Sequence, residues 1–128
     1  MKLLLDTHTF IWWDSAPNEL SAATLQQIES IDNEVYISLA SRWEIQIKTQ
    51  LGRLELKADL AELIRQQQTE NGVSLLPISL PHISELEHLP YYHKDPFDRI
   101  TIAQSRIEAA AVVTCDRTFR QYDCEIIW

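Results

Sequence analysis

One stretch of the sequence couples a helix start to two carboxylates, and it reads His93-Lys94-Asp95-Pro96-Phe97-Asp98-Arg99-Ile100-Thr101-Ile102-Ala103-Gln104. Pro96 suits the first position of a helix, and Asp95 suits the N-cap before it. Asp98 then falls in the first turn, near backbone N–H groups that have no partner within the helix. Further along, apolar residues recur at helical spacing and predict one buried face. These residues are Ile100, Ala103 and Ile107.

The same pattern is also that of an ordinary capped helix. Acidic side chains in a first turn stabilise the helix dipole without any further role. This segment alone therefore does not indicate chemistry, and a functional interpretation needs acids from other parts of the chain.

The length and composition of the chain predict one domain, spanning residues 1–128. Of these residues 45% are hydrophobic and only two are glycine, so we expect a compact fold with its own core. The longest apolar runs, such as residues 3–5 and 109–113, are far too short to cross a bilayer, and no signal-peptide pattern follows Met1. The sequence therefore predicts a cytoplasmic protein.

The charge and the cysteine content exclude two further classes. A formal net charge of −8 argues against a broad basic surface for nucleic acid, so any such role must depend on a local site. Cys115 and Cys124 are too few for a disulfide framework and are expected to be small buried hydrophobic residues. The four histidines lack the spacing of a zinc site.

Short apolar or β-branched runs alternate with helical patterns along the chain. Strands are predicted at residues 2–5, 35–37, 73–76, 111–114 and 125–128. Helices are predicted at 18–30, 39–51, 59–71, 81–88 and from residue 96 onward, with a short helical turn around Phe119 and Tyr122. Two buried stripes are expected, one at Ala40, Trp43, Ile47 and Leu51 and one at Ile83 and Leu86.

This alternation predicts an α/β fold. We expect a three-layer α/β/α sandwich whose central, mostly parallel sheet has four to five strands and right-handed crossovers. In such folds the functional crevice lies outside the carboxyl ends of the strands. Four acids from separate segments map to that edge, which is hard to explain by capping. They are Asp6, Glu44, Asp98 and Asp116.

Ionised carboxylates that share a cleft repel one another, unless their pKa values rise or a cation binds. Hard divalent ions such as Mg²⁺ and Mn²⁺ prefer carboxylate oxygens and keep several waters for a phosphate substrate. Such ions generate a hydroxide nucleophile and stabilise an in-line displacement at phosphorus. Metal-dependent phosphodiester hydrolysis is the interpretation that uses all four acids.

With these residues assembled, the chain resembles the PIN-domain ribonucleases, specifically the VapC-type toxins of bacterial type II toxin–antitoxin pairs. The matching segments are residues 3–8, 41–45, 93–104 and 113–117, with Phe119 and Tyr122. The resemblance implies an endoribonuclease that needs Mg²⁺ or Mn²⁺ and forms a homodimer. It also implies inhibition of translation and growth through cleavage of tRNA or mRNA, and a small antitoxin whose tail enters the active site.

The resemblance assigns a role to each acid. Asp6 and Asp98 correspond to the principal metal ligands of the family, Glu44 to its helix-borne acid and Asp116 to a fourth, more variable one. For Asp116 the alternative is a cap for the short helix after it. Asp95 matches the Asp-Pro-Phe-Asp run of the subfamily and is assigned to the helix cap.

Several neighbouring residues have open roles. The hydroxyls of Thr7 and Thr114 orient water or a carboxylate, or else bind nearby backbone. The cations Arg42, Lys94 and Arg99 contact RNA phosphate, or else pair with acids or are solvated. The aromatic residues Trp13, Tyr91 and Tyr92 stack on bases, or else belong to a core or an interface.

Two rival functions remain for the same fold. The first is a phosphatase that uses Asp6 as a covalent nucleophile, although His8 stands where the dehalogenase-like pattern has a second aspartate. The second is a non-catalytic module whose acids attract a basic peptide.

Overall fold

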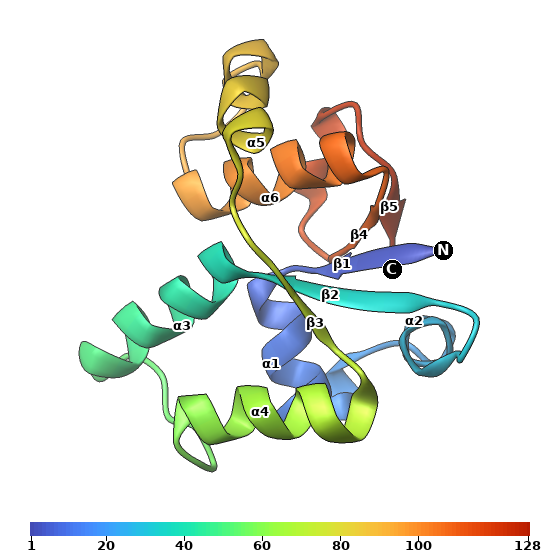
Figure 1. Ribbon diagram of the computed structural model, residues 1–128, viewed down its shortest axis with the longest axis vertical. Coiled ribbons are helices and arrows are strands. Elements are labelled where there is room, and N and C mark those ends of the chain that lie inside the picture. The colour runs from blue at the N-terminus through green and yellow to red at the C-terminus, as the bar shows by residue number, and fades with distance from the viewer.

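The computed structural model describes residues 1–128 and has one five-stranded sheet in which every pair of neighbouring strands is parallel (Figure 1). The strand order is β3-β2-β1-β4-β5. The strands are β1 (Lys2–Leu5), β2 (Glu34–Ser38), β3 (Ser74–Leu76), β4 (Ala111–Val113) and β5 (Ile126–Ile127). The predicted α/β fold is confirmed, with a sheet that is wholly rather than mostly parallel.

Helices connect the strands and cover both faces of the sheet (Figure 1). The α-helices are α1 (Thr7–Ser15), α2 (Ala22–Glu29), α3 (Leu39–Gln50), α4 (Leu60–Asn71), α5 (Leu80–Glu85) and α6 (Pro96–Glu108). Three short 3₁₀ helices are η1 (Pro17–Glu19), η2 (Leu86–His88) and η3 (Arg117–Gln121). No helix combines the length and the apolar character that crossing a membrane requires.

The alternation of side chains along the strands divides the core into two clusters. Leu3 and Leu5 of β1 belong to a cluster with apolar residues of α1, α2, α3 and α4, whereas Val112 of β4 belongs to a cluster built mainly on α6. Because successive strand residues point to opposite faces, the two clusters lie on opposite sides of the sheet. The sheet is therefore the middle of three layers, as predicted.

Helix α1 was not predicted, and the helix expected at 18–30 is shorter than expected. The segment 7–15 has no apolar stripe at helical spacing, and two of its three buried residues are threonines, Thr7 and Thr9. The later helix begins only at Ala22, because the Ser21 hydroxyl caps it by accepting from the N–H of Thr24. Ser21 is thus the N-cap of α2.

Several predicted inward positions were wrong. Trp43 of α3 and Leu51, its C-cap, are exposed, and the buried residues of α3 are Ala40, Ser41, Glu44 and Ile45. Ile83, Ile107 and Cys115 are exposed as well. Simple periodicity fails in α6 because all seven residues from 99 to 105 are buried, so this helix is covered on more than one side.

The helix start in the stretch 93–104 forms as predicted. Oδ1 of Asp95 accepts hydrogen bonds from the backbone N–H of Phe97, at 2.9 Å, and of Asp98, at 3.1 Å. Pro96 is the first residue of α6. The cap therefore fixes where Asp98 stands.

Candidate functional site

The order of the strands creates a switch point between β1 and β4. From β1 the chain runs outward through β2 to β3, and it then crosses to β4 and β5 on the other side of β1. In open parallel sheets, ligands bind beside the carboxyl ends of the two strands at such a reversal. Asp6 directly follows β1, and Thr114 directly follows β4.

Asp6 is held by hydrogen bonds at both carboxylate oxygens. Its Oδ1 accepts from the backbone N–H of Thr9, at 2.8 Å, and so caps α1. Its Oδ2 accepts from the hydroxyl of Thr114, at 2.5 Å. The side chain of Thr114 is buried, and Asp6 is only 7% exposed. The orientation of this carboxylate is therefore set before any ligand arrives.

Glu44 is brought to the same edge by α3, which begins directly after β2. Its Oε1 accepts from the hydroxyl of Thr7, at 2.6 Å. Its Oε2 lies 3.1 Å from the ammonium group of Lys48, one turn further along α3. Thr7 and Thr114 thus both donate to acids and orient these carboxylates, and the hydroxyl of Thr114 also accepts from the backbone N–H of Asp116.

Asp98 lies in the first turn of α6, and its environment disfavours the charged form. Burial raises the pKa of this carboxyl from 3.8 to about 7, and repulsion from Asp95, Glu44, Asp116 and Asp6 adds to the shift. The three other predicted site acids are all among these repelling groups. The topology therefore brings all four predicted acids into one electrostatic neighbourhood.

Asp116 is exposed at the end of β4, and both interpretations of it have support. Its Oδ1 accepts from the N–H of Thr118, at 2.9 Å, and so caps η3. Its own N–H donates to the hydroxyl of Thr114, at 3.0 Å. Because it also repels Asp98, the cap does not remove this residue from the acidic edge.

The four acids are neighbours without forming a closed cage. No three carboxylate, imidazole or thiol side chains stand close enough together to make a ready metal-binding cluster. Lys48 provides the one ion pair from a lysine or arginine to any of the four acids. The donor set of hard oxygens with little opposing charge fits a divalent cation such as Mg²⁺ or Mn²⁺.

Comparisons with known proteins identify the family of this chain. The family model described as PIN domain matches residues 3–124. The chain belongs to the PIN-domain family. Over 127 residues it is 28% identical to "Ribonuclease VapC22" of Mycobacterium tuberculosis, an alignment that covers 94% of this chain and 91% of the relative.

Solved structures confirm the PIN fold. A chain in the structure of VapBC2 from Rickettsia felis, bound to a DNA fragment from its promoter, has a TM-score of 0.76 at 13% identity, covering 99% of this chain and 98% of that one. VapBC-1 from nontypeable Haemophilus influenzae gives 0.69 at 15% identity, covering 99% and 97%. FitAcB from Neisseria gonorrhoeae gives 0.67 at 20% identity, covering 98% and 96%.

Two of the cations that were considered for phosphate binding have other contacts in this PIN domain. Arg99 is only 5% exposed, and it donates to the carbonyls of Leu89 and Pro90 and to the hydroxyl of Tyr122. Its guanidinium also lies 4.0 Å from the ring centre of Tyr91. Arg99 is therefore a structural residue, and neither RNA contact nor pairing with an acid describes it.

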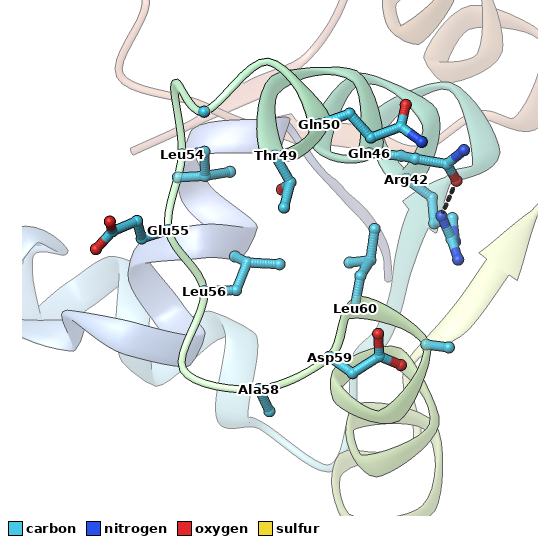
Figure 2. Close-up of a pocket in the computed structure, with 12 residues that line it drawn as sticks. Arg42, Gln46, Thr49, Gln50, Leu54, Glu55, Leu56, Ala58, Asp59 and Leu60 are labelled. Atoms are coloured by element: carbon cyan, nitrogen blue, oxygen red, sulfur yellow. Dashed lines mark hydrogen bonds between the residues drawn. The ribbon is translucent and has the colours of Figure 1, made fainter.

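Arg42 forms its side-chain hydrogen bond with another polar residue of α3. Its guanidinium donates to Oε1 of Gln46, and both residues line an open pocket of about 700 Å³ between α3, the segment 52–59 and the start of α4 (Figure 2). None of the four acids lines this pocket. Of the three cations, Lys94 is the one with an exposed side chain.

The sequence reasoning missed His93 as a site residue and considered it only as a zinc ligand. Its Nε2 lies 3.3 Å from Oδ2 of Asp98, and its Nδ1 lies 2.8 Å from the hydroxyl of Tyr122. The available signal was its position in the stretch 93–104, five residues before Asp98.

Proposed function

We propose that this PIN domain is a metal-dependent endoribonuclease that acts as the toxin of a toxin–antitoxin pair. The observation that supports this most strongly is the meeting of four acids at the switch point, where burial, with added repulsion from the other three, raises the pKa of Asp98 to about 7. Such uncompensated charge favours binding of a cation. The 28% identity to a protein named as a ribonuclease supports RNA as the substrate.

In this proposal Asp6, Glu44, Asp98 and Asp116 hold Mg²⁺ or Mn²⁺. When bound, such an ion supplies an activated water and neutralises charge that develops on the reacting phosphate. It also provides the local positive potential that a chain of net charge −8 otherwise lacks for RNA.

The chain's own residues orient these acids. The hydroxyls of Thr7 and Thr114 donate to Glu44 and Asp6, so a lone pair of each carboxylate is already engaged and the side chains lose little freedom on binding. Lys48 compensates part of the charge of Glu44. Asp6 and Glu44 are each only 7% exposed, which limits the water around them.

The similar solved structures support a protein partner for this chain. Similar solved structures include VapBC2, FitAB and a toxin–antitoxin complex from Klebsiella pneumoniae, which supports a cognate antitoxin for this chain as well. We also propose that the protein is a cytoplasmic homodimer. Its proposed substrate is tRNA, with mRNA as the second candidate. Cleavage of either RNA would stop translation and growth.

The experiment that tests the function is expression of this chain without a partner, followed by sequencing of the RNA ends that appear. We expect new ends at defined positions in a small set of RNAs, and none when Asp6→Asn is expressed instead. The purified protein should cut the same RNA with Mg²⁺ or Mn²⁺ and should stop when EDTA is added.

Other outcomes would favour the rival functions. Hydrolysis of a mononucleotide phosphate without RNA cleavage would favour an Asp6 nucleophile. Absence of any hydrolysis with either ion, in a protein that still binds a partner, would favour a non-catalytic module.

A further inference from the structure

The hydroxyl of Tyr122 has three hydrogen-bonding neighbours, two of them in His93, and it contacts the ring nitrogen that does not face Asp98. It lies 2.8 Å from Nδ1 of His93 and 3.3 Å from the backbone nitrogen of the same residue. It also lies 3.2 Å from Nη1 of Arg99. Tyr122 and Arg99 are 4% and 5% exposed, so water does not compete freely for these contacts.

The donors and lone pairs available at each group determine the direction of each hydrogen bond. A tyrosine hydroxyl has one proton and two lone pairs. The guanidinium of Arg99 and the backbone N–H of His93 are donors only, so they occupy the lone pairs. The remaining O–H then donates to Nδ1 of His93, which is also the shortest of the three contacts. Nδ1 is an acceptor, and in a neutral imidazole the proton stands on Nε2.

The proton on Nε2 faces the site. Nε2 lies 3.3 Å from Oδ2 of Asp98, so His93 is the donor and the carboxylate is the acceptor. The imidazole also packs against the rings of Phe119 and Tyr122, with ring centres 6.3 and 5.4 Å apart. Donor and ring orientation are therefore both set by buried groups.

We propose that His93 is a positioning residue, which Tyr122 and Arg99 lock in one tautomer so that it holds the carboxylate of Asp98 towards the other acids. The role rests on the proposed function in one respect, namely that Asp98 is a metal ligand. The chain from Arg99 through Tyr122 and His93 supplies the hydrogen bond that Asp98 needs to stay among like charges. Outer partners of this kind tune metal affinity by about 10–100-fold.

Mn²⁺ titrations followed by electron paramagnetic resonance test the role without RNA. His93→Leu removes the donor and is expected to weaken Mn²⁺ binding about 10–100-fold. His93→Gln is expected to recover most of the affinity, because its amide nitrogen reaches the place of Nε2. Tyr122→Phe removes the hydroxyl that fixes the tautomer of His93, and it is expected to weaken Mn²⁺ binding less than His93→Leu does. His88→Leu, at an exposed histidine of η2, is the matched control and should change nothing.

A second background separates positioning from general damage to the fold. In Asp98→Asn, the His93→Leu change should weaken Mn²⁺ binding no further, because the carboxylate it serves is gone. Equal weakening in both backgrounds, or unchanged affinity in His93→Leu, would overturn the proposal. Circular dichroism melts of each variant establish that the comparison is between folded proteins.

The tautomer is open to direct measurement in the wild-type protein. Imidazole ¹⁵N shifts at about pH 8, where a free histidine is neutral, should show Nε2 protonated and Nδ1 bare. A proton on Nδ1 would overturn the relay. A protein that binds Mn²⁺ with this dependence on His93 but cuts no RNA would refute the proposed function alone. One that binds no Mn²⁺ would refute both.

Discussion

The hydroxyl of Thr114 lies 2.5 Å from Oδ2 of Asp6, although the two residues are 108 positions apart in the sequence. The same hydroxyl accepts the N–H of Asp116, at 3.0 Å. One side chain therefore joins the end of β1 to the segment after β4 and connects two of the four acids. The register of these neighbouring strands, in which Leu5 lies beside Val113, brings the residues together.

Replacing Thr114 by valine should lower RNA cleavage by about 10-fold or more, because Asp6 loses the donor that orients it. The melting temperature should fall as well, since a hydrogen bond to a charged group contributes about 1.5–3 kcal/mol. Thr114→Ser keeps the hydroxyl and is the matched control. Valine and serine variants of equal activity would show that the hydroxyl has no role.

The pKa of Asp98 predicts how stability depends on pH in the metal-free protein. Because burial and neighbouring acids raise this pKa to about 7 from 3.8, the folded state binds the proton more tightly than the unfolded chain. The resulting stability is fully present below pH 3.8 and is lost as the pH rises through about 7. Asp98→Asn should therefore raise the melting temperature above pH 7, where wild type carries the repelled charge.

Thermal melts across this pH range, with and without Mg²⁺, measure the effect. Added Mg²⁺ should raise the melting temperature of wild type and should have much less effect on Asp98→Asn. An asparagine variant that is less stable than wild type above pH 7 would contradict the electrostatic argument.

Asp6→Asn should lower the rate of RNA cleavage by orders of magnitude, while the protein stays folded. The asparagine oxygen can still accept the N–H of Thr9, so the cap of α1 is kept. Circular dichroism and an RNA cleavage assay on the same sample check both parts. Full activity in Asp6→Asn combined with Asp98→Asn would refute the assignment of the site.

Ala109 ends α6 in the left-handed region, at a φ of 52°. This conformation is strained for a residue with a Cβ, so Ala109→Gly should stabilise the fold by up to about 1 kcal/mol. Gly72 ends α4 at a φ of 66°, and a Cβ there would meet nothing within 4 Å. Gly72→Ala should therefore destabilise by a similar amount, through the same backbone strain and not through a clash. Urea denaturation measures the free energy of unfolding of both variants. A change of the same sign in both would contradict this prediction.

The charge of the chain predicts a feature of the proposed antitoxin. With a net charge of −8 and four acids at one edge, the site should receive an arginine or lysine side chain from the partner. Binding should weaken with added salt, and replacing that cation by alanine should release nuclease activity. A co-purified partner without a cation near Asp6 and Asp98 would contradict this prediction.

Local signals carried much of the fold prediction. The cap at Asp95, the strand at residues 2–5 and the helix at residues 59–71 each follow from neighbouring residues, and the structure has all three, the helix as α4. The prediction failed for α1 and for the stripe of α3. Both helices bury polar residues: Thr7 of α1 donates to Glu44 of α3, and Thr9 of α1 donates to the carbonyl of Val113, so burial there does not follow hydrophobicity.

By itself, the sequence determined the alternation of strands and helices and the position of each acid just beyond a strand or in an early helical turn. These features depend on side chains within a few residues of one another. Only the tertiary structure decided which groups meet the acids: Thr7 at Glu44, Thr114 at Asp6, and His93 with Tyr122 at Asp98. Most of these contacts join residues 29–108 positions apart, and no local periodicity encodes the register and packing that bring such residues together.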